Sequence, residues 1–84
     1  MPTNVIFLSM SGKIFTGQLS DNFTLDELAK VVTDKLGKAE NGGSFRYIVK
    51  GTEFSADDPN KFEEQKKLIT SGVTVYVCQR MRGG

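Results

Sequence analysis

The sequence predicts an α+β domain in which one helix of about three turns packs across one face of a four- or five-stranded mixed sheet. Three observations predict this architecture. Short runs of β-branched and aromatic residues lie near both ends of the chain, one amphipathic segment lies between them, and turn signals separate the elements. With 84 residues, the chain is long enough for one compact core and too short for a second.

The first two strands are predicted to form an antiparallel hairpin. Residues 5–8 are β-branched and aromatic, residues 14–19 alternate roughly between apolar and polar, and Ser11-Gly12-Lys13 between them is a typical turn. Gly17 is a poor strand residue. We therefore expect either a bulge or close packing against another element at this position.

A helix is predicted from Thr24 to Gly37. Thr24 and Glu27 fit a capping box, in which Thr24 accepts from the Glu27 amide and the Glu27 carboxylate returns to the Thr24 backbone. Gly37 is expected to end the helix in the left-handed conformation. Apolar residues at spacings of three and four form one stripe along the helix: Leu25, Leu28, Val32 and Leu36.

The second half of the chain is predicted to contain a strand over residues 45–49, a short strand over 52–54 and a last strand over 73–78. Residues 55–67 are polar and are expected to form a long irregular loop with a turn at Asp57-Asp58-Pro59. The side chains expected to anchor this loop to the core are Phe62, Leu68 and Ile69. Two apolar strands near the ends of the chain would pair at the centre of the sheet, which is a β-grasp layout.

Strand alternation also predicts which residues face outward. If Val73, Val75 and Val77 of the last strand face the core, Tyr76 and Cys78 share its outward face. Ile48 lies on the corresponding outer face of the third strand. The sequence therefore predicts an exposed apolar surface at these positions.

Composition limits the function. The chain has no histidine and one cysteine, which leaves no His-based catalytic triad and no cluster of metal ligands. Its net charge of +1 gives no electrostatic reason to bind nucleic acid or a membrane, and no apolar run is long enough for a membrane span. We expect a monomeric protein of the cytoplasm or nucleus that is not an enzyme and binds no cofactor.

The last five residues carry the clearest functional signal. Gly83 and Gly84 have no side chains, so the final carboxylate can enter a narrow channel. Arg80 and Arg82 offer forked cationic donors to a protein that grips the tail, with Met81 between them. We expect a domain over residues 1–78 and a flexible tail over 79–84 that is held in extended form while its carboxylate reacts. A frayed terminus and an Arg-Gly-Gly nucleic-acid segment are the alternatives, although such segments recur in arrays.

The chain resembles ubiquitin and its modifier relatives over nearly its full length. The ending reproduces the Arg-Leu-Arg-Gly-Gly of ubiquitin, with leucine exchanged for Met81. The chain carries additional residues at its start, between the helix and the third strand, and within residues 55–67. The matching segments fall in the same order: Phe7, Ser11-Gly12-Lys13, the helix from Thr24 to Gly37, residues 46–51 and residues 80–84.

The resemblance implies a mechanism in which this protein is the substrate. An activating enzyme would use ATP and magnesium to adenylate the Gly84 carboxylate, and the acyl group would pass as a thioester to a conjugating enzyme. A ligase would direct it to a substrate lysine as an isopeptide, and a deconjugating protease would remove it. Arg80 corresponds to the arginine by which the ubiquitin-activating enzyme rejects related modifiers.

The resemblance also implies recognition positions. The small apolar patch through which ubiquitin-binding readers recognise ubiquitin corresponds to Met10, Ile48, Tyr76 and Cys78. Lys13 and Lys35 match lysines used for minor chain linkages. Two other functions remain open at this stage: a β-grasp sulfur carrier whose terminal glycine becomes a thiocarboxylate, and a ubiquitin-like interaction module that is not conjugated.

Overall fold

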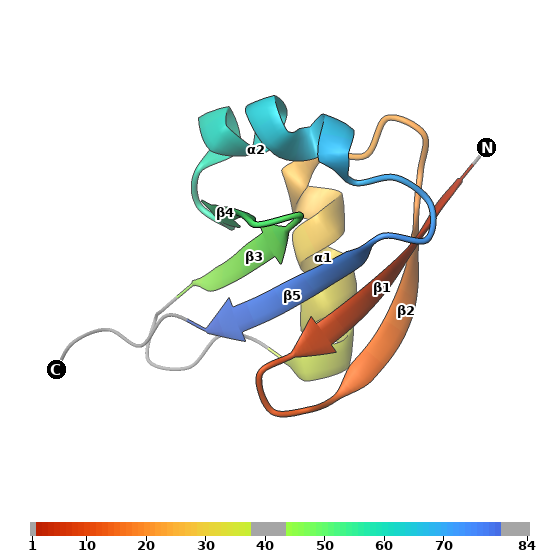
Figure 1. Ribbon diagram of the computed structural model, residues 1–84, viewed down its shortest axis with the longest axis vertical. Coiled ribbons are helices and arrows are strands. Elements are labelled where there is room, and N and C mark those ends of the chain that lie inside the picture. Colours follow the sequence, from red (N-terminus) through yellow and green to blue (C-terminus); the bar gives the residue numbers. More distant parts are fainter. Residues whose placement is uncertain (1, 38–43, 80–84) are drawn as a thin grey trace, which may run out of the picture.

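The computed structural model describes residues 2–37 and 44–79. These residues form a mixed sheet with helix α1 across one face and a second, shorter helix at one end (Figure 1). The elements in chain order are β1 (Thr3–Ser9), β2 (Ile14–Leu19), α1 (Leu25–Leu36), β3 (Phe45–Val49), β4 (Thr52–Ser55), α2 (Pro59–Gln65), the 3₁₀ helix η2 (Lys66–Leu68) and β5 (Thr74–Gln79).

The sheet has five strands in the order β2-β1-β5-β3-β4. The terminal strands β1 and β5 pair in parallel beside each other, with Phe7 opposite Val75, and the other neighbours are antiparallel. The predicted pairing of the two end strands is thus confirmed. The β-grasp arrangement is visible in Figure 1, where the blue strand β5 lies between β1 and β3.

The inner face of the sheet and the apolar stripe of α1 enclose one hydrophobic core. The residues of β3 and β5 that were predicted to face inward are buried, whereas Val73, predicted to face the core from the last strand, precedes β5 and is only partly buried. Leu28 and Val32 of α1 are fully buried. The buried core residues are Val5, Phe7, Phe15, Leu19, Phe23, Leu28, Val32, Phe45, Tyr47, Val49, Phe54, Phe62, Ile69, Val75 and Val77.

Gly17 of β2 lies close against Val31 of α1. The β1–β2 register runs without interruption, with Gly17 opposite Val5, so there is no bulge at this position. A Cβ atom on Gly17 would lie 2.5 Å from Cγ1 of Val31 and 3.0 Å from Cε2 of Phe7. Close packing against the helix, the second of the two expected reasons, therefore explains this glycine.

The start of α1 corrects one part of the predicted capping box. Thr24 Oγ1 accepts a hydrogen bond from the Glu27 amide at 3.1 Å, as predicted. The Glu27 carboxylate does not return to Thr24: it accepts from the Ser20 amide and the Ser20 hydroxyl, each at 2.7 Å. These two bonds lower the pKa of Glu27, with the hydroxyl bond contributing most. The carboxylate thus ties the start of α1 to the end of β2.

The end of α1 also differs in detail from the prediction. Gly37 has a positive φ of 82°, as expected, but its ψ of 179° is extended and not left-handed helical. This region of backbone space is essentially restricted to glycine. The Gly37 amide donates to the Thr33 carbonyl at 2.8 Å, which closes the last turn.

The prediction of an irregular loop over residues 55–67 is wrong, because helix α2 forms there. Asp58 caps the helix by accepting from the Lys61 amide at 3.1 Å, and Pro59 occupies the first turn. Phe62 anchors the helix in the core, as predicted for this residue, and its ring contacts Phe23 and Phe54. The Asp-Pro pair was the sequence signal for this helix.

Candidate functional site: the outer face of the sheet

The strand register brings predicted patch residues together on the sheet face opposite α1. Ile48 of β3 lies directly opposite Tyr76 of β5, and Arg46 lies opposite Cys78. The Tyr76 side chain is 47% exposed, while Ile48 and Cys78 are half-buried. The predicted outward orientation of these three side chains is confirmed.

Met10, the fourth predicted patch residue, lies in the β1–β2 turn. It is 79% exposed, and its amide donates to the carbonyl of Val77 at 3.2 Å. This bond holds the turn against β5 at Val77, the residue between Tyr76 and Cys78. Met10 is therefore placed at the border of the outer face.

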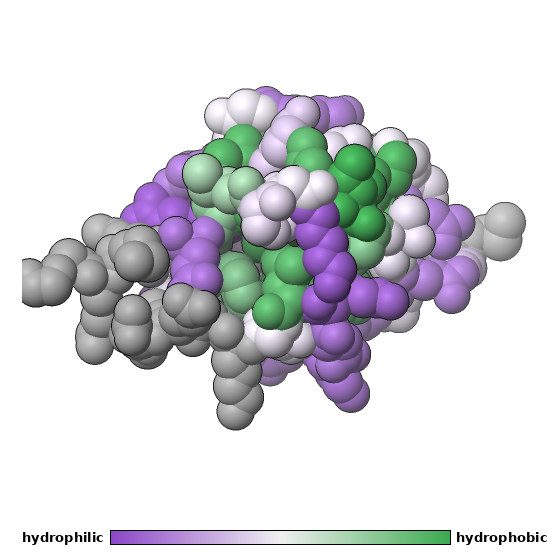
Figure 2. Space-filling model, turned by 90° about the horizontal axis from the view of Figure 1, so that it is seen from below, coloured by the Kyte–Doolittle hydropathy of each residue, from purple (hydrophilic) through white to green (hydrophobic). Residues whose placement is uncertain are grey.

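The outer face extends further than the sequence predicted. In register across four strands, Ile14 of β2 faces Leu8 of β1, Leu8 faces Tyr76, and Tyr76 faces Ile48. Ile14 is 67% exposed and Ile6, on the same face of β1, is 37% exposed. Figure 2 shows the molecule from below the view of Figure 1, where the β1–β2 turn lies, and hydrophobic residues reach that surface between hydrophilic ones.

An apolar surface of this kind on a small protein is typical of a protein-binding site. The signal for its extension was present in the first strand. Ile6 and Leu8 alternate with the core residues Val5 and Phe7, so they had to face away from the core.

A charged pair borders this face on the β3–β4 side. Arg46 of β3 forms an ion pair with Glu53 of β4, and both side chains are substantially exposed to solvent. Because exposed pairs contribute little to stability, its main effect is to place charge at the margin of the apolar surface. This margin lies beside Ile48, which is opposite Glu53 in the register.

The two lysines matched to chain linkages lie at the same end of the molecule. Lys13 follows the β1–β2 turn, and its Nζ donates to the carbonyl of Lys35 in the last turn of α1 at 3.0 Å. Both side chains are exposed. A cation near the C-terminal carbonyls of a helix is favourable.

The tail starts at the end of β5. The strand includes Gln79, which pairs with Phe45, so strand pairing continues one residue past the predicted domain boundary at Cys78. The predicted recognition and conjugation residues of the tail lie outside the described part of the chain: Arg80, Met81, Arg82, Gly83 and Gly84.

Residues 2–37 and 44–79 contain neither a metal-binding cluster nor a membrane-spanning helix. No group of three or more histidine, cysteine, aspartate or glutamate side chains in this part of the chain could hold a metal ion. No helix there is long and apolar enough to cross a membrane. Cys78 carries a free, half-buried thiol.

The fold is similar to solved ubiquitin-like structures. A computationally designed protein based on human erythrocytic ubiquitin matches with a TM-score of 0.70 and 24% identity, covering 98% of this chain and 96% of that one. A second design based on ubiquitin has a TM-score of 0.72 and 24% identity, with 98% and 93% covered. The UBL domain of Plasmodium falciparum Dsk2 has a TM-score of 0.66 and 22% identity, with 95% and 100% covered.

No protein-family model matches the sequence, and no curated protein matches it. The chain thus has the ubiquitin-like β-grasp fold with a sequence that has diverged widely from the solved structures of this fold.

Proposed function

We propose that this chain is a ubiquitin-like protein modifier that is conjugated through the carboxylate of Gly84. The observation that carries the proposal is the sequence Arg-Met-Arg-Gly-Gly, which directly follows β5 on a ubiquitin-like fold. The proposal holds equally if a protease must first expose Gly84. The chain supplies no catalytic group in this scheme, because the chemistry belongs to its enzymes.

The proposed reaction is an adenylation followed by three acyl transfers. The Gly84 carboxylate attacks the α-phosphorus of magnesium-bound ATP on an activating enzyme, forming an acyl adenylate and releasing pyrophosphate. A cysteine thiolate of that enzyme displaces AMP to give a thioester, which passes to the cysteine of a conjugating enzyme. With a ligase, a substrate lysine amine then attacks the carbonyl, loses a proton and releases the thiolate, leaving an isopeptide.

The tail and the outer face of the sheet would have separate roles. Arg80 and Arg82 would pair with carboxylates of the activating enzyme and of the deconjugating protease, where bidentate contacts favour arginine over lysine. The surface around Ile48 and Tyr76 would dock ubiquitin-binding-type readers, with Met10 and Cys78 at its border. The protein would act as a monomer in the cytoplasm, the nucleus or both, and Lys13 and Lys35 would be the acceptors if chains form.

An activation assay tests this proposal. The tagged protein is incubated with extract from its source cells, ATP and magnesium, and the products are separated on gels with and without reductant. We expect an ATP-dependent adduct that reductant removes and a ladder that resists reductant. The variant lacking Gly84 is the control, and neither species should form with it.

A ubiquitin-like interaction module that is not conjugated is the second candidate. It is favoured by the likeness to the UBL domain of Dsk2, because that structure is one domain of the protein Dsk2. ATP-independent capture of partners by the Ile48 surface, with no adduct in the activation assay, would select this candidate. A mass gain matching exchange of oxygen for sulfur at Gly84, without a ladder, would instead identify a sulfur carrier.

A further inference from the structure

An open cleft lies between the start of α1 and helix α2, and it shares no lining residue with the patch at Met10, Ile48, Tyr76 and Cys78. It has a volume of about 350 Å³. Its lining comes from the first turn of α1, the segment after β4, and α2: Thr24, Leu25, Asp26, Ala56, Asp57, Pro59, Phe62 and Glu63. Because α2 occupies the segment in which this chain carries additional residues relative to ubiquitin, the resemblance did not predict this cleft.

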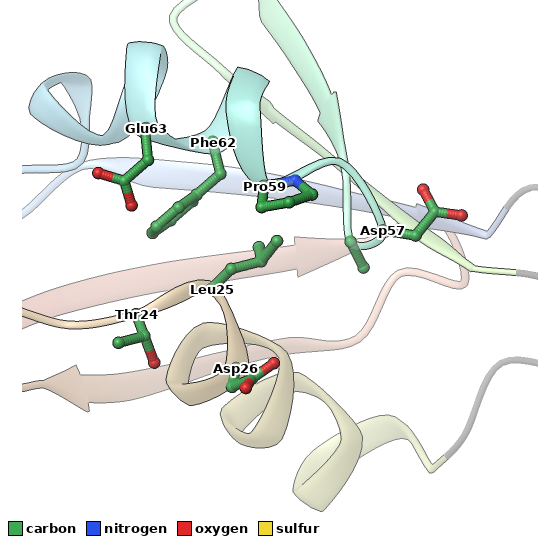
Figure 3. Close-up of a pocket in the computed structure, with 8 residues that line it drawn as sticks. Thr24, Leu25, Asp26, Asp57, Pro59, Phe62 and Glu63 are labelled. Carbon is green, nitrogen blue, oxygen red and sulfur yellow. The ribbon is translucent and has the colours of Figure 1, made fainter.

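The floor of the cleft is apolar. Leu25 of α1 and Phe62 of α2 approach it from opposite sides, and Pro59 lies beside Phe62 (Figure 3). Leu25 and Ala56 are only half-buried, so part of their apolar surface remains in contact with water. Covering that surface with another apolar side chain would be favourable.

The rim of the cleft is acidic. Three carboxylates line it, from Asp26, Asp57 and Glu63, and no lysine or arginine does. All three side chains are exposed, and within the described residues none of them forms an ion pair. Lys66 lies over the Phe62 ring, 5.8 Å from its centroid, but is not part of the lining.

The apolar floor and the acidic rim together indicate which kind of ligand the cleft would bind. The carboxylates do not form a group that could hold a metal ion. An apolar floor between separated carboxylates is complementary to an apolar side chain with cationic side chains on either side. The volume, at the low end for a ligand pocket, suits one or two side chains better than a drug-sized molecule.

We propose that this cleft binds a short segment of a partner protein in which a leucine-like residue lies between two arginines or lysines. The apolar side chain covers Leu25 and Ala56, and the two cations pair with the acidic rim. The site is independent of Gly84 and of the Ile48 surface. A conjugated or an unconjugated form of the protein would therefore bind such a segment equally well.

Three capped tripeptides test the chemistry by titration into ¹⁵N-labelled protein. Arg-Leu-Arg carries both features, Arg-Gly-Arg lacks the apolar side chain, and Glu-Leu-Glu reverses the charge. We expect Arg-Leu-Arg to shift the amides of Leu25, Ala56 and Phe62, with weaker binding of Arg-Gly-Arg and no saturable binding of Glu-Leu-Glu. Equal binding of the first two peptides would overturn the role of the floor, and no shift with Arg-Leu-Arg would overturn the site.

Two double variants separate the cleft from the overall charge. Asp26→Asn/Glu63→Gln removes two of the three rim charges and leaves Asp57. The matched control Asp34→Asn/Glu64→Gln removes two charges from exposed positions of the same helices that do not line the cleft. We expect the rim variant to weaken Arg-Leu-Arg binding about fivefold and the control by less than about twofold.

Equal weakening by both double variants would show general charge attraction and would refute the site. Thermal melts of both variants check that the fold is retained. If the rim variant is unstable, Glu63→Gln alone is compared with Glu64→Gln. Glu63→Gln should again weaken Arg-Leu-Arg binding more than Glu64→Gln does.

Discussion

Replacing Gly17 by alanine adds one methyl group at a close contact between β2 and α1. The new Cβ would lie 2.5 Å from Cγ1 of Val31 and 3.0 Å from Cε2 of Phe7, so at least one neighbour must move. Valine in a helix has one strongly preferred rotamer, so Val31 cannot rotate away without cost. The Phe7 ring is fully buried and stacked on Phe15 at 5.1 Å, which restricts movement on that side as well.

The net effect follows from two opposing contributions. Overpacking a core by one methylene costs about 1–3 kcal/mol. Replacing glycine by alanine at a compatible backbone position gains about 0.4–1 kcal/mol because the unfolded chain has less freedom. We therefore expect Gly17→Ala to lower the free energy of unfolding by about 1–2 kcal/mol and the melting temperature by about 5–15 °C.

Urea and thermal denaturation measure this change. Gln18→Ala, at the exposed neighbouring position of β2, is the control and should change the free energy of unfolding by less than about 0.5 kcal/mol. Val31→Ala removes the clashing methyl, so Gly17→Ala should be neutral or stabilising in that background, with a coupling of about 1–2 kcal/mol. Unchanged or increased stability of Gly17→Ala in the wild-type background would refute the close-packing explanation.

Three further predictions concern single side chains. Tyr47 is fully buried and its hydroxyl has no hydrogen-bond partner among residues 2–37 and 44–79, so Tyr47→Phe should raise the free energy of unfolding by about 1 kcal/mol in urea denaturation. Burial raises the Tyr47 pKa above its ordinary value of 10.0, so the wild type loses stability as the pH rises past 10.0 and its deficit relative to Tyr47→Phe should widen there. Because hydrogen bonds from Ser20 lower the Glu27 pKa below its ordinary value of 4.5, Glu27→Gln should be less stable than the wild type at neutral pH. Melts at decreasing pH should show this gap closing below 4.5. Ile48→Ala should lower the free energy of unfolding less than Val49→Ala does, although it removes more atoms, because Ile48 is on the outer face and Val49 is fully buried. Ile48→Ala should also leave thioester formation intact. If denaturation shows the larger loss of stability for Ile48→Ala, the assigned faces of β3 are wrong.

Local patterns predicted the sheet and α1 well. Strand alternation placed Tyr47 inside and Ile48 outside on β3, and the spacing of Leu28 and Val32 predicted the buried stripe of α1. Such patterns predict burial correctly because a short segment already shows the periodicity that decides which side chains face the core.

Features that depend on distant segments were not predictable in this way. The partner of Glu27 is Ser20, whose position depends on how the chain passes from β2 to α1. Helix α2 was missed for a local reason: it is short and polar with Phe62 as its buried anchor, so it shows no apolar stripe, and Asp58-Pro59, which begins it, was interpreted as a turn.

The candidate site was likewise predictable where it depends on local alternation and not where it depends on strand register. Alternation predicted that Tyr76 and Cys78 face outward, but the contribution of Ile14 depends on the register of two strand pairs. The tail was interpreted from its residue types alone, and residues 80–84 lie outside the described part of the chain. Its role therefore depends on chemistry that can be measured directly.

The most direct test of the modifier proposal is to identify the branch that the protein leaves on its targets. The tagged protein is purified from its source cells under denaturing conditions and cleaved after lysine, and the peptides are sequenced by mass spectrometry. Because Lys67 is the last lysine of the chain, conjugation would leave residues 68–84 joined to a substrate lysine, a branch that distinguishes this protein from ubiquitin. We predict such branched peptides with the wild type and none with the variant lacking Gly84; their absence from both, with the tagged protein abundant, would contradict conjugation.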